Sequence, residues 1–368
     1  NRVMILRSHI GLICRFALAA LGIALAADGP ARGDATEDIL KYAGVDREQK
    51  LVEGAKKEGQ GVIYSAMIVN QALRPLTEGF MRKYPFVKAT YWRADSEYLT
   101  TKITAEVRAN NVVADVLEGT GVGELVSEAN LALPYHTPMV DAYPQKYRDP
   151  EGLWTATRLS YYSIAYNSRI VAADKVPRTY DDLLDPQWKG KLAWRIGSAS
   201  GAALFITNLR IAWGEERAQA YLAKLSEQKI INFGSGSART LVDRVVAGEY
   251  PIALQIFAHH PLISKAKGAS VNSQLLAPVP STAATMVIPK GLRHPYAAML
   301  LVDYILSKDG QTILLKADYF PAHPEVPPAD ALAPVVPKHA NVQEQFVGPR
   351  LLNKYNESSE RIYEKLFR

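Results

Sequence analysis

Cysteine is almost absent from this 368-residue chain, which contains a single one, Cys14. One cysteine cannot form an internal disulfide, and a structural metal site built on thiolates needs several. Both ways of cross-linking the fold are therefore excluded. A lipoprotein anchor is also excluded, because Cys14 lies before the apolar run of the N-terminus rather than directly after it. Stability must therefore come from a hydrophobic core, and a chain of this length can build one, most simply as two domains.

Long apolar runs are scarce too, and the clearest one lies near the N-terminus. Arg7 and Arg15 precede residues 16–27, an apolar run that is too short to span a bilayer and is followed by small residues up to Gly33. This order predicts a secretory signal peptide over residues 1–33, cleaved after Gly33. We therefore expect a periplasmic protein with no membrane insertion after signal removal, and a mature chain without a thiol.

The chain also lacks a strong charge of either sign. Its formal net charge is +6, and about half of that comes from the predicted leader, whose charged residues are Arg2, Arg7, Arg15, Asp28 and Arg32. A nucleic-acid-binding protein would need basic clusters interleaved with aromatic residues, so we expect no nucleic-acid partner. A mild positive charge is compatible with an anionic ligand.

The common catalytic and cofactor motifs are missing as well. The turn at residues 197–201 has Ala199 where a serine hydrolase would carry its nucleophile. There is no phosphate loop of the Gly-Lys-Ser/Thr type and no dinucleotide fingerprint. We therefore predict a binding protein without enzymatic activity, cofactor or metal, although a catalytic dyad assembled from distant residues stays open.

The first half of the chain alternates short apolar runs with helical patterns. Strands are expected at residues 61–67, 87–92 and 114–117, separated by helices at 71–84 and 96–109. This alternation predicts a doubly wound α/β sheet. Ligands of such sheets sit beyond the carboxyl ends of the strands, where the candidate contacts are Ser65, Ala66, Arg93 and Thr120.

The second half predicts another α/β lobe. A β-rich segment at residues 155–167 leads to a new α/β pattern from Leu192, and a strand-like run at 283–288 returns toward the first lobe. We expect lobe 1 at residues 34–160, lobe 2 at 161–277, and a return to lobe 1 plus C-terminal helices at 278–368, with a last helix near 344–367. Two doubly wound lobes would then be joined by a two-crossing hinge, with Arg158 and Tyr162 as candidate ligand contacts.

Two glycine/serine turns stand at expected helix starts in lobe 2. Such turns leave backbone N–H groups free and form seats for an anion. Their candidate contacts are Ser198, Ser200, Ser235, Gly236 and Ser237. The alternative is that these serines only cap ordinary helices, since Ser is a favoured N-cap residue.

Two further candidates are a histidine pair and an acidic residue. His259 and His260 invite a metal interpretation, but successive residues of an extended loop point in opposite directions and no third ligand is close in sequence. We therefore expect a solvated loop pair, with His259 as a candidate ligand contact. Glu118, beside the third strand, is expected either to contact a ligand amine or to pair with a nearby arginine.

Several short motifs recur in an order that resembles a known family. They are Tyr64-Ser-Ala66, Ala114-Asp-Val116, Tyr166-Asn167, Leu183 to Leu192, Trp213-Gly-Glu-Glu216, Ala247-Gly-Glu249 and Tyr319 to Pro324. Over nearly the whole mature chain, this order resembles the ABC-transporter solute-binding proteins of the type 2 periplasmic fold, in the group that includes bacterial ferric-binding proteins. The resemblance implies a monomeric receptor that delivers a small molecule to an ABC transporter permease.

The resemblance also implies where a ferric ion would be held. Ferric binders of this group typically place a His after the first strand, a carboxylate after the third and a Tyr pair in the second lobe. Those places hold Ile68, Thr120 and Ala258-His259 here, and a hard cation needs anionic oxygen donors. We therefore predict capture of a small organic anion (a carboxylate, phosphonate or phosphate ester) in the interlobe cleft. The alternatives are a ferric receptor with a non-standard site that includes His259, and a periplasmic enzyme or sensor subunit on the same fold.

Overall fold

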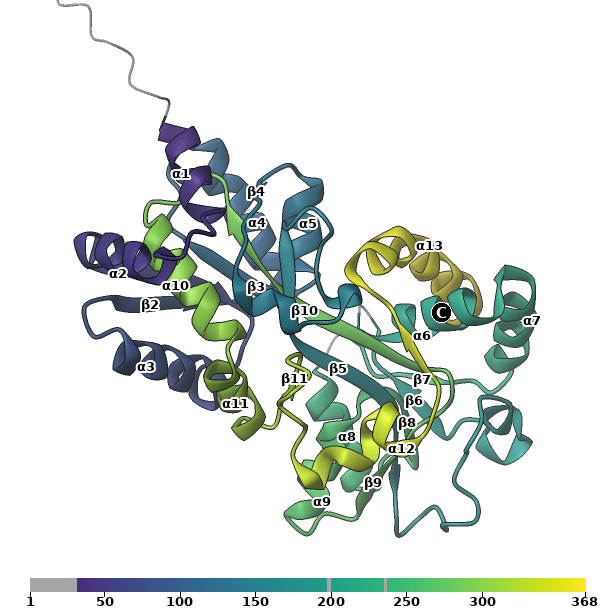
Figure 1. The fold of residues 1–368 in the computed structure, drawn as a ribbon. Helices are drawn as coiled ribbons and strands as arrows, with labels where there is room; N and C mark the ends of the chain where they lie inside the picture. The colour runs from purple at the N-terminus through teal and green to yellow at the C-terminus, as the bar shows by residue number, and fades with distance from the viewer. Residues whose placement is uncertain (1–31, 197–199, 235–236) are drawn as a thin grey trace, which may run out of the picture.

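The computed structural model describes residues 32–196, 200–234 and 237–368. It shows two α/β lobes whose strands form one continuous sheet in the order β2-β1-β3-β10-β5-β8-β6-β7 (Figure 1). The predicted α/β class is confirmed. The predicted leader at 1–33 lies almost entirely outside the described residues, and the first helix, α1, spans Arg32–Leu40.

Lobe 1 is built on three parallel strands, as the sequence pattern predicts. They are β1 (Gln60–Ser65), β2 (Lys88–Arg93) and β3 (Val116–Thr120), and the helices around them are α2 (Arg47–Glu58), α3 (Arg74–Lys83), α4 (Ser96–Arg108) and α5 (Val122–Glu128). The third strand continues beyond its predicted end at Leu117. Gly119 lies within this strand. A Cβ there would come 2.7 Å from the Ser96 hydroxyl, so the glycine lets α4 pack closely against the strand.

Two long strands connect the lobes. Strand β5 (Trp154–Asn167) runs unbroken through the predicted boundary after residue 160, and it pairs antiparallel with both β10 (Val279–Pro289) and β8 (Ile252–Phe257). A bulge between Ser163 and Ala165, opposite the left-handed Gln255 (φ 55°), interrupts the pairing with β8. Short strands β9 (Val271–Gln274) and β11 (Phe320–Pro321) also pair with β5.

Lobe 2 continues the sheet beyond β8 with two parallel strands, β6 (Leu192–Trp194) and β7 (Ile231–Asn232). Its helices are α6 (Ala202–Trp213), α7 (Glu215–Ser226), α8 (Ala238–Val246) and α9 (His259–Ala266). Most buried apolar side chains of lobe 2 form a cluster of their own, whereas Ala258 and Leu275 belong to the cluster of lobe 1 and so link the two cores.

The C-terminal part of the chain contacts both lobes. Helices α10 (Pro295–Leu306) and α11 (Lys308–Lys316) cover lobe 1, whereas α13 (Pro349–Phe367) lies against α6 of lobe 2 (Figure 1). The prediction of one helix from residue 344 is wrong at its start. Residues 344–346 form β12, which pairs with β10, and Pro349 opens the helix in a position where its missing N–H costs nothing.

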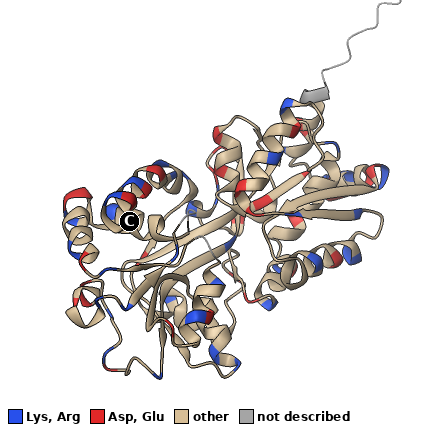
Figure 2. Cartoon of the chain, turned by 180° about the vertical axis from the view of Figure 1, so that it is seen from behind, with Lys and Arg blue, Asp and Glu red and all other residues tan. Residues whose placement is uncertain are grey.

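Charged side chains of both signs are interspersed over the helices of both lobes, and the strands carry few (Figure 2). Of the described helices, none is long and apolar enough to cross a bilayer.

We predict that Trp194→Ala lowers the free energy of unfolding by about 3–5 kcal/mol, because it removes a buried aromatic side chain. Trp194 is fully buried, and its ring centroid lies 4.7 Å from that of Phe367 in α13. Urea denaturation measures the loss, with Trp92→Ala, at a 39% exposed position, as the control. Equal losses in the two variants would contradict this packing.

Candidate functional site

The carboxyl ends of strands from both lobes meet at the crossing of β5. Thr120 ends β3 and lies opposite Ala284 of β10, which in turn lies opposite Arg158 of β5. From the other lobe, Phe257 ends β8 opposite Tyr162 of β5. Ligands of α/β sheets bind at such carboxyl ends, so the segment between Arg158 and Tyr162 is the centre of the candidate site.

A buried carboxylate fixes the first cation of this site. Glu118 has no exposed surface, and it accepts hydrogen bonds from the Ser65 hydroxyl (2.7 Å), the Thr157 hydroxyl (3.0 Å) and Arg158 Nε (3.0 Å). Burial alone would lower the pKa of Arg158, but the charge of Glu118 holds it above its usual range. Glu118 therefore pairs with an arginine, one of its two expected roles, and orients that arginine at the crossing.

The histidine pair is not the solvated loop that the sequence suggested. His259 and His260 form the first turn of α9, with ring centroids 4.5 Å apart, and His259 is buried. The helix starts before Pro261 because proline is tolerated in a first turn, whose N–H groups need no partner. The Nδ1 atoms of both rings are buried without a hydrogen-bond partner among the described residues.

Both histidines are neutral at neutral pH. Burial lowers the pKa of His260 to about 4, and the positive charges of Arg239 and Arg195 act in the same direction. The pKa of His259 is well below its usual value, first because of burial and then because of His260, Arg158 and Arg239. The geometry agrees: the Phe320 ring centroid lies 5.4 Å from that of His259, and the Arg158 guanidinium lies over the ring of the preceding residue, Tyr319.

Two arginines of lobe 2 complete the group. Arg195 follows β6 directly, and its Nη2 donates to the Ser200 hydroxyl, while its buried Nε has no partner among the described residues. Burial lowers the pKa of Arg195, which is the sign of a desolvated cation. Arg239, in the first turn of α8, donates to the His260 carbonyl at 3.4 Å. We call Arg158, Arg195, Arg239, His259 and His260 the interlobe cluster.

The structure brings four of the predicted contacts together around this cluster. Arg158 and His259 belong to it, Ser200 bonds Arg195, and Tyr162 lies beneath it with its hydroxyl 3.2 Å from that of Thr282. Ala66 and Thr120 lie partly exposed at the ends of β1 and β3. The predicted contacts that lie in or beside the candidate site are thus Ala66, Thr120, Arg158, Tyr162, Ser200 and His259.

Ser65 and Arg93 occupy different positions. Ser65 has no exposed surface, and its hydroxyl donates to Glu118 and accepts from the Met67 N–H, so it supports the carboxylate from below. Arg93 lies on the edge strand β2, four strand positions from β5, a separation of about 19 Å. There it pairs with Asp95 at 2.8 Å.

The serine turn before α8 forms a helix cap. The Ser237 hydroxyl accepts a hydrogen bond from the Thr240 N–H at 3.1 Å, which is the N-cap arrangement that the sequence left as an alternative. Ser198, Ser235 and Gly236 lie outside the described residues. Their predicted contacts with a ligand stay predictions.

Sequence reasoning missed Arg195, Arg239 and His260. Arg195 directly follows a strand, so the rule that selected Ser65 and Arg93 applies to it equally. Its strand is only three residues long, which hides the strand end in the sequence. Arg239 and His260 reach the site from the first turns of two helices, and only the packing of those helices brings them together.

The site is poor in ligands for a hard cation. Ile68 is 51% exposed where ferric binders are expected to place a histidine, and Ala258 is fully buried where a tyrosine is expected. Among the described residues there is no group of three His, Cys, Asp or Glu side chains able to hold a metal ion. Guanidinium groups with neutral imidazoles instead favour an anion.

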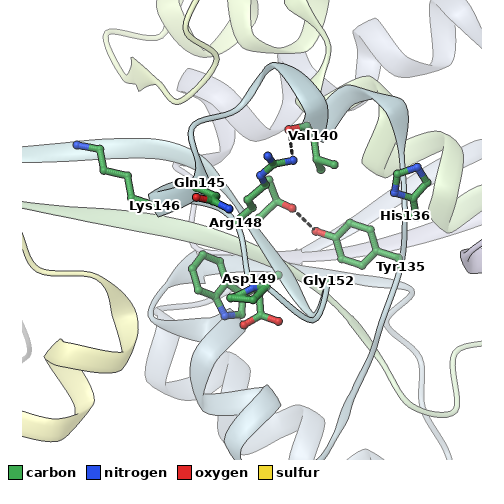
Figure 3. A pocket seen from close by; sticks show the side chains of 11 residues that line it. Tyr135, His136, Val140, Gln145, Lys146, Arg148, Asp149 and Gly152 are labelled. Atoms are coloured by element: carbon green, nitrogen blue, oxygen red, sulfur yellow. Dashed lines mark hydrogen bonds between the residues drawn. The ribbon is translucent and has the colours of Figure 1, made fainter.

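A separate hollow of about 650 Å³ lies on lobe 1, around the start of β5. Arg148 points across it and donates to the Val140 carbonyl, and Tyr135 reaches into it from the other side (Figure 3). None of its lining residues belongs to the interlobe cluster. The cations of the two lobes converge at the interlobe cluster and not at this hollow, so the interlobe cluster is the candidate ligand site.

Comparison with known proteins identifies the family. Residues 113–344 match the family described as bacterial extracellular solute-binding protein, and the chain belongs to it. An uncharacterised protein of Haemophilus influenzae is 28% identical over 279 residues, which cover 71% of this chain and 77% of that protein.

Solved structures define the class more closely. An iron- and citrate-bound protein of Trichodesmium has a TM-score of 0.70 at 19% identity, covering 84% of this chain and all of that one. The periplasmic binding protein AfuA of Actinobacillus pleuropneumoniae, with exogenous fructose-6-phosphate bound, has a TM-score of 0.67 at 23% identity over 84% and 99% of the two chains. The chain therefore has the type 2 periplasmic-binding fold. It is a solute-binding protein of the ABC importer type, as its resemblance implied.

We predict that the neutral histidines make the protein less stable as the pH falls. Unfolded histidines take up protons near their usual pKa of about 6.5, whereas folded His260 does so only at about 4, so stability is lost across this window on acidification. The double variant His259→Gln with His260→Gln should show a shallower loss. Urea unfolding at several pH values measures it, and His339→Gln, at an exposed position, should keep the parent slope.

We also predict that Arg158→Met costs about 3–5 kcal/mol of stability, because it leaves the charge of Glu118 buried without a cation. Adding Glu118→Gln to this variant should restore part of the loss. The double-mutant cycle, measured by urea unfolding, gives the coupling between the two side chains. Strictly additive effects would show that the ion pair does not hold the crossing together.

Proposed function

We propose that this protein is a periplasmic receptor that captures a small organic anion, with a phosphate monoester as the favoured class, in a cleft between the lobes. It then delivers the ligand to an ABC permease powered by a separate ATPase. The observation that carries the proposal is the interlobe cluster, in which arginines from both lobes lie beside two neutral histidines at the strand ends. Carboxylates and phosphonates are the other members of this anion class.

The cations of the cluster are only partly neutralised by the protein. Glu118 uses the Nε of Arg158, and Asp243 lies 3.5 Å from Arg239. Arg195 forms no ion pair with any described carboxylate, although burial makes its charge costly. An incoming anion would offset this cost and form charge-assisted hydrogen bonds, which are about twice as strong as neutral ones.

A phosphate monoester suits the cluster better than a simple carboxylate. Its terminal oxygens outnumber those of a carboxylate, so arginines of both lobes and an imidazole could contact it together. The AfuA structure, with fructose-6-phosphate bound, shows that this fold accommodates such a molecule. That likeness supports the class of ligand and leaves its identity to experiment.

A ferric receptor is the second candidate, and the iron- and citrate-bound Trichodesmium protein favours it. Iron would have to be held through a bound anion here, with His259 as a side-chain donor. The exposed Ile68 and the buried Ala258 cannot supply the anionic oxygen donors that ferric iron prefers. We therefore rank the anion above the metal.

The proposal includes a monomer without enzymatic activity, exported by the predicted signal peptide. Binding would draw the two lobes together about β5 and β10, and the permease would recognise the closed form. A periplasmic enzyme or sensor subunit on the same fold is the remaining alternative, and turnover of the ligand would reveal an enzyme.

Calorimetric titration tests the proposal directly. After removal of bound solute by unfolding and refolding, we expect fructose 6-phosphate or another phosphate monoester to bind without iron. Arg195→Gln should weaken binding by about 10- to 100-fold, because it removes charge-assisted hydrogen bonds. Arg244→Gln is the matched control, since Arg244 lies on the surface of α8 and pairs with Glu249 at 2.9 Å.

Three outcomes would contradict the proposal. Binding of ferric citrate but of no iron-free anion would favour the iron receptor. Release of inorganic phosphate from the ester would establish an enzyme. Equal weakening by Arg195→Gln and Arg244→Gln would place the anion outside the interlobe cluster.

A further inference from the structure

An exposed isoleucine borders the interlobe cluster on the side of lobe 1. Ile68 follows β1 and precedes the helical turn at Val69–Leu73, and its side chain is 51% exposed. Its backbone N–H donates to the Tyr319 hydroxyl at 3.2 Å. The Arg158 guanidinium lies over the ring of the same tyrosine, 4.8 Å from its centroid. Ile68 is therefore held one side chain away from a cation of the cluster.

The hydrogen bond from the Ile68 N–H to the Tyr319 hydroxyl fixes the position of this loop residue. Tyr319 is buried, and it links the loop after β1 to the arginine at the crossing. The exposed apolar surface of Ile68, separated from Arg158 by Tyr319, would release free energy if an apolar group covered it. A ligand that fills the space beside Arg158 would supply that burial.

A second large side chain is exposed in the first turn of α4, beside the end of β3. Ser96 begins α4 with its hydroxyl against Gly119 of β3, and Glu97 follows it in the first turn. The next residue, Tyr98, is 66% exposed. Lobe 1 thus offers an aliphatic and an aromatic side chain near the cations that lobe 2 and the crossing provide.

Aromatic rings also surround the histidines of the cluster. The Phe257 ring centroid lies 5.3 Å from that of His260, and the Phe320 centroid lies 5.4 Å from that of His259. Phe257 is only partly buried at the end of β8. The surroundings of the charged groups are therefore apolar on both sides of the crossing.

We infer that the ligand carries an apolar or aromatic body beside its anionic group, and that Ile68 is a specificity-determining residue that contacts this body. The inference rests on the proposed function and deepens it. The anionic group would occupy the interlobe cluster, while the body would lie against Ile68 and face the first turn of α4. A ligand whose body consists of hydroxyl groups would leave the isoleucine without a partner.

Two phosphate monoesters distinguish an apolar ligand body from a hydroxylated one. Phenyl phosphate has an aromatic body, and glycerol 3-phosphate has a hydroxylated body. We expect the protein to bind phenyl phosphate about tenfold more tightly, as burial of apolar surface predicts. Ile68→Ser should reduce this preference by about fivefold and leave glycerol 3-phosphate binding nearly unchanged. The variant should fold, because serine is favoured at the N-cap position that Ile68 occupies and the backbone N–H is retained.

Ile170→Ser is the matched control, since Ile170 has nearly the same exposure, 52%, on lobe 2. It should leave the preference between the two esters unchanged. Equal affinity for both esters, or a preference that Ile68→Ser does not alter, would overturn the inference while the anion receptor stands. Binding of neither ester, together with no binding of fructose 6-phosphate or of any other iron-free anion, would overturn the proposed function itself, and the inference with it.

Discussion

The buried contact between Glu118 and Arg158 is the constraint on which the rest of the site depends. Strand β5 has to carry the chain from one lobe to the other, and Arg158 lies on it just before the crossing. Glu118, at the end of β3, holds that arginine by its Nε while the Ser65 and Thr157 hydroxyls hold the carboxylate. One carboxylate thus ties together β1, β3 and β5, which is why the first cation of the cluster has a fixed place.

Among the other members of the cluster, Arg195 carries a positive charge that no described carboxylate neutralises by an ion pair. Arg195 and the two histidines are desolvated, and burial together with the neighbouring arginines keeps the imidazoles neutral. A metal cation would add to the repulsion among the three arginines, whereas an anion would relieve it. The ferric-site places expected from the resemblance hold Ile68 and Ala258, neither of which can ligate a metal, whereas three arginines lie at the interlobe cluster.

Local patterns in the sequence were sufficient for the strands β1, β2 and β3 and the helices α3 and α4 of lobe 1. They were insufficient where packing decides the structure. The third strand, expected to end at Leu117, extends to Thr120 through Gly119, where only a glycine lets Ser96 approach so closely. His259 and His260 look like a solvated pair, yet a helix begins there, which buries His259 and covers part of His260. Arg158 was predicted from its place at the crossing, whereas Arg239 belongs to the site only through the packing of α8 beside α9, which no short-range pattern reveals.

The most direct measurement is a crystal structure of the protein with tungstate, a phosphate mimic whose anomalous scattering locates a bound anion without ambiguity. Our account predicts a strong peak between the lobes, within contact of Arg158, Arg195 and the histidine pair of α9. A peak in the lobe 1 hollow beside Arg148, or at Arg93 on the outer edge of the sheet, would contradict it. So would an empty interlobe cluster in crystals that bind iron at the same place.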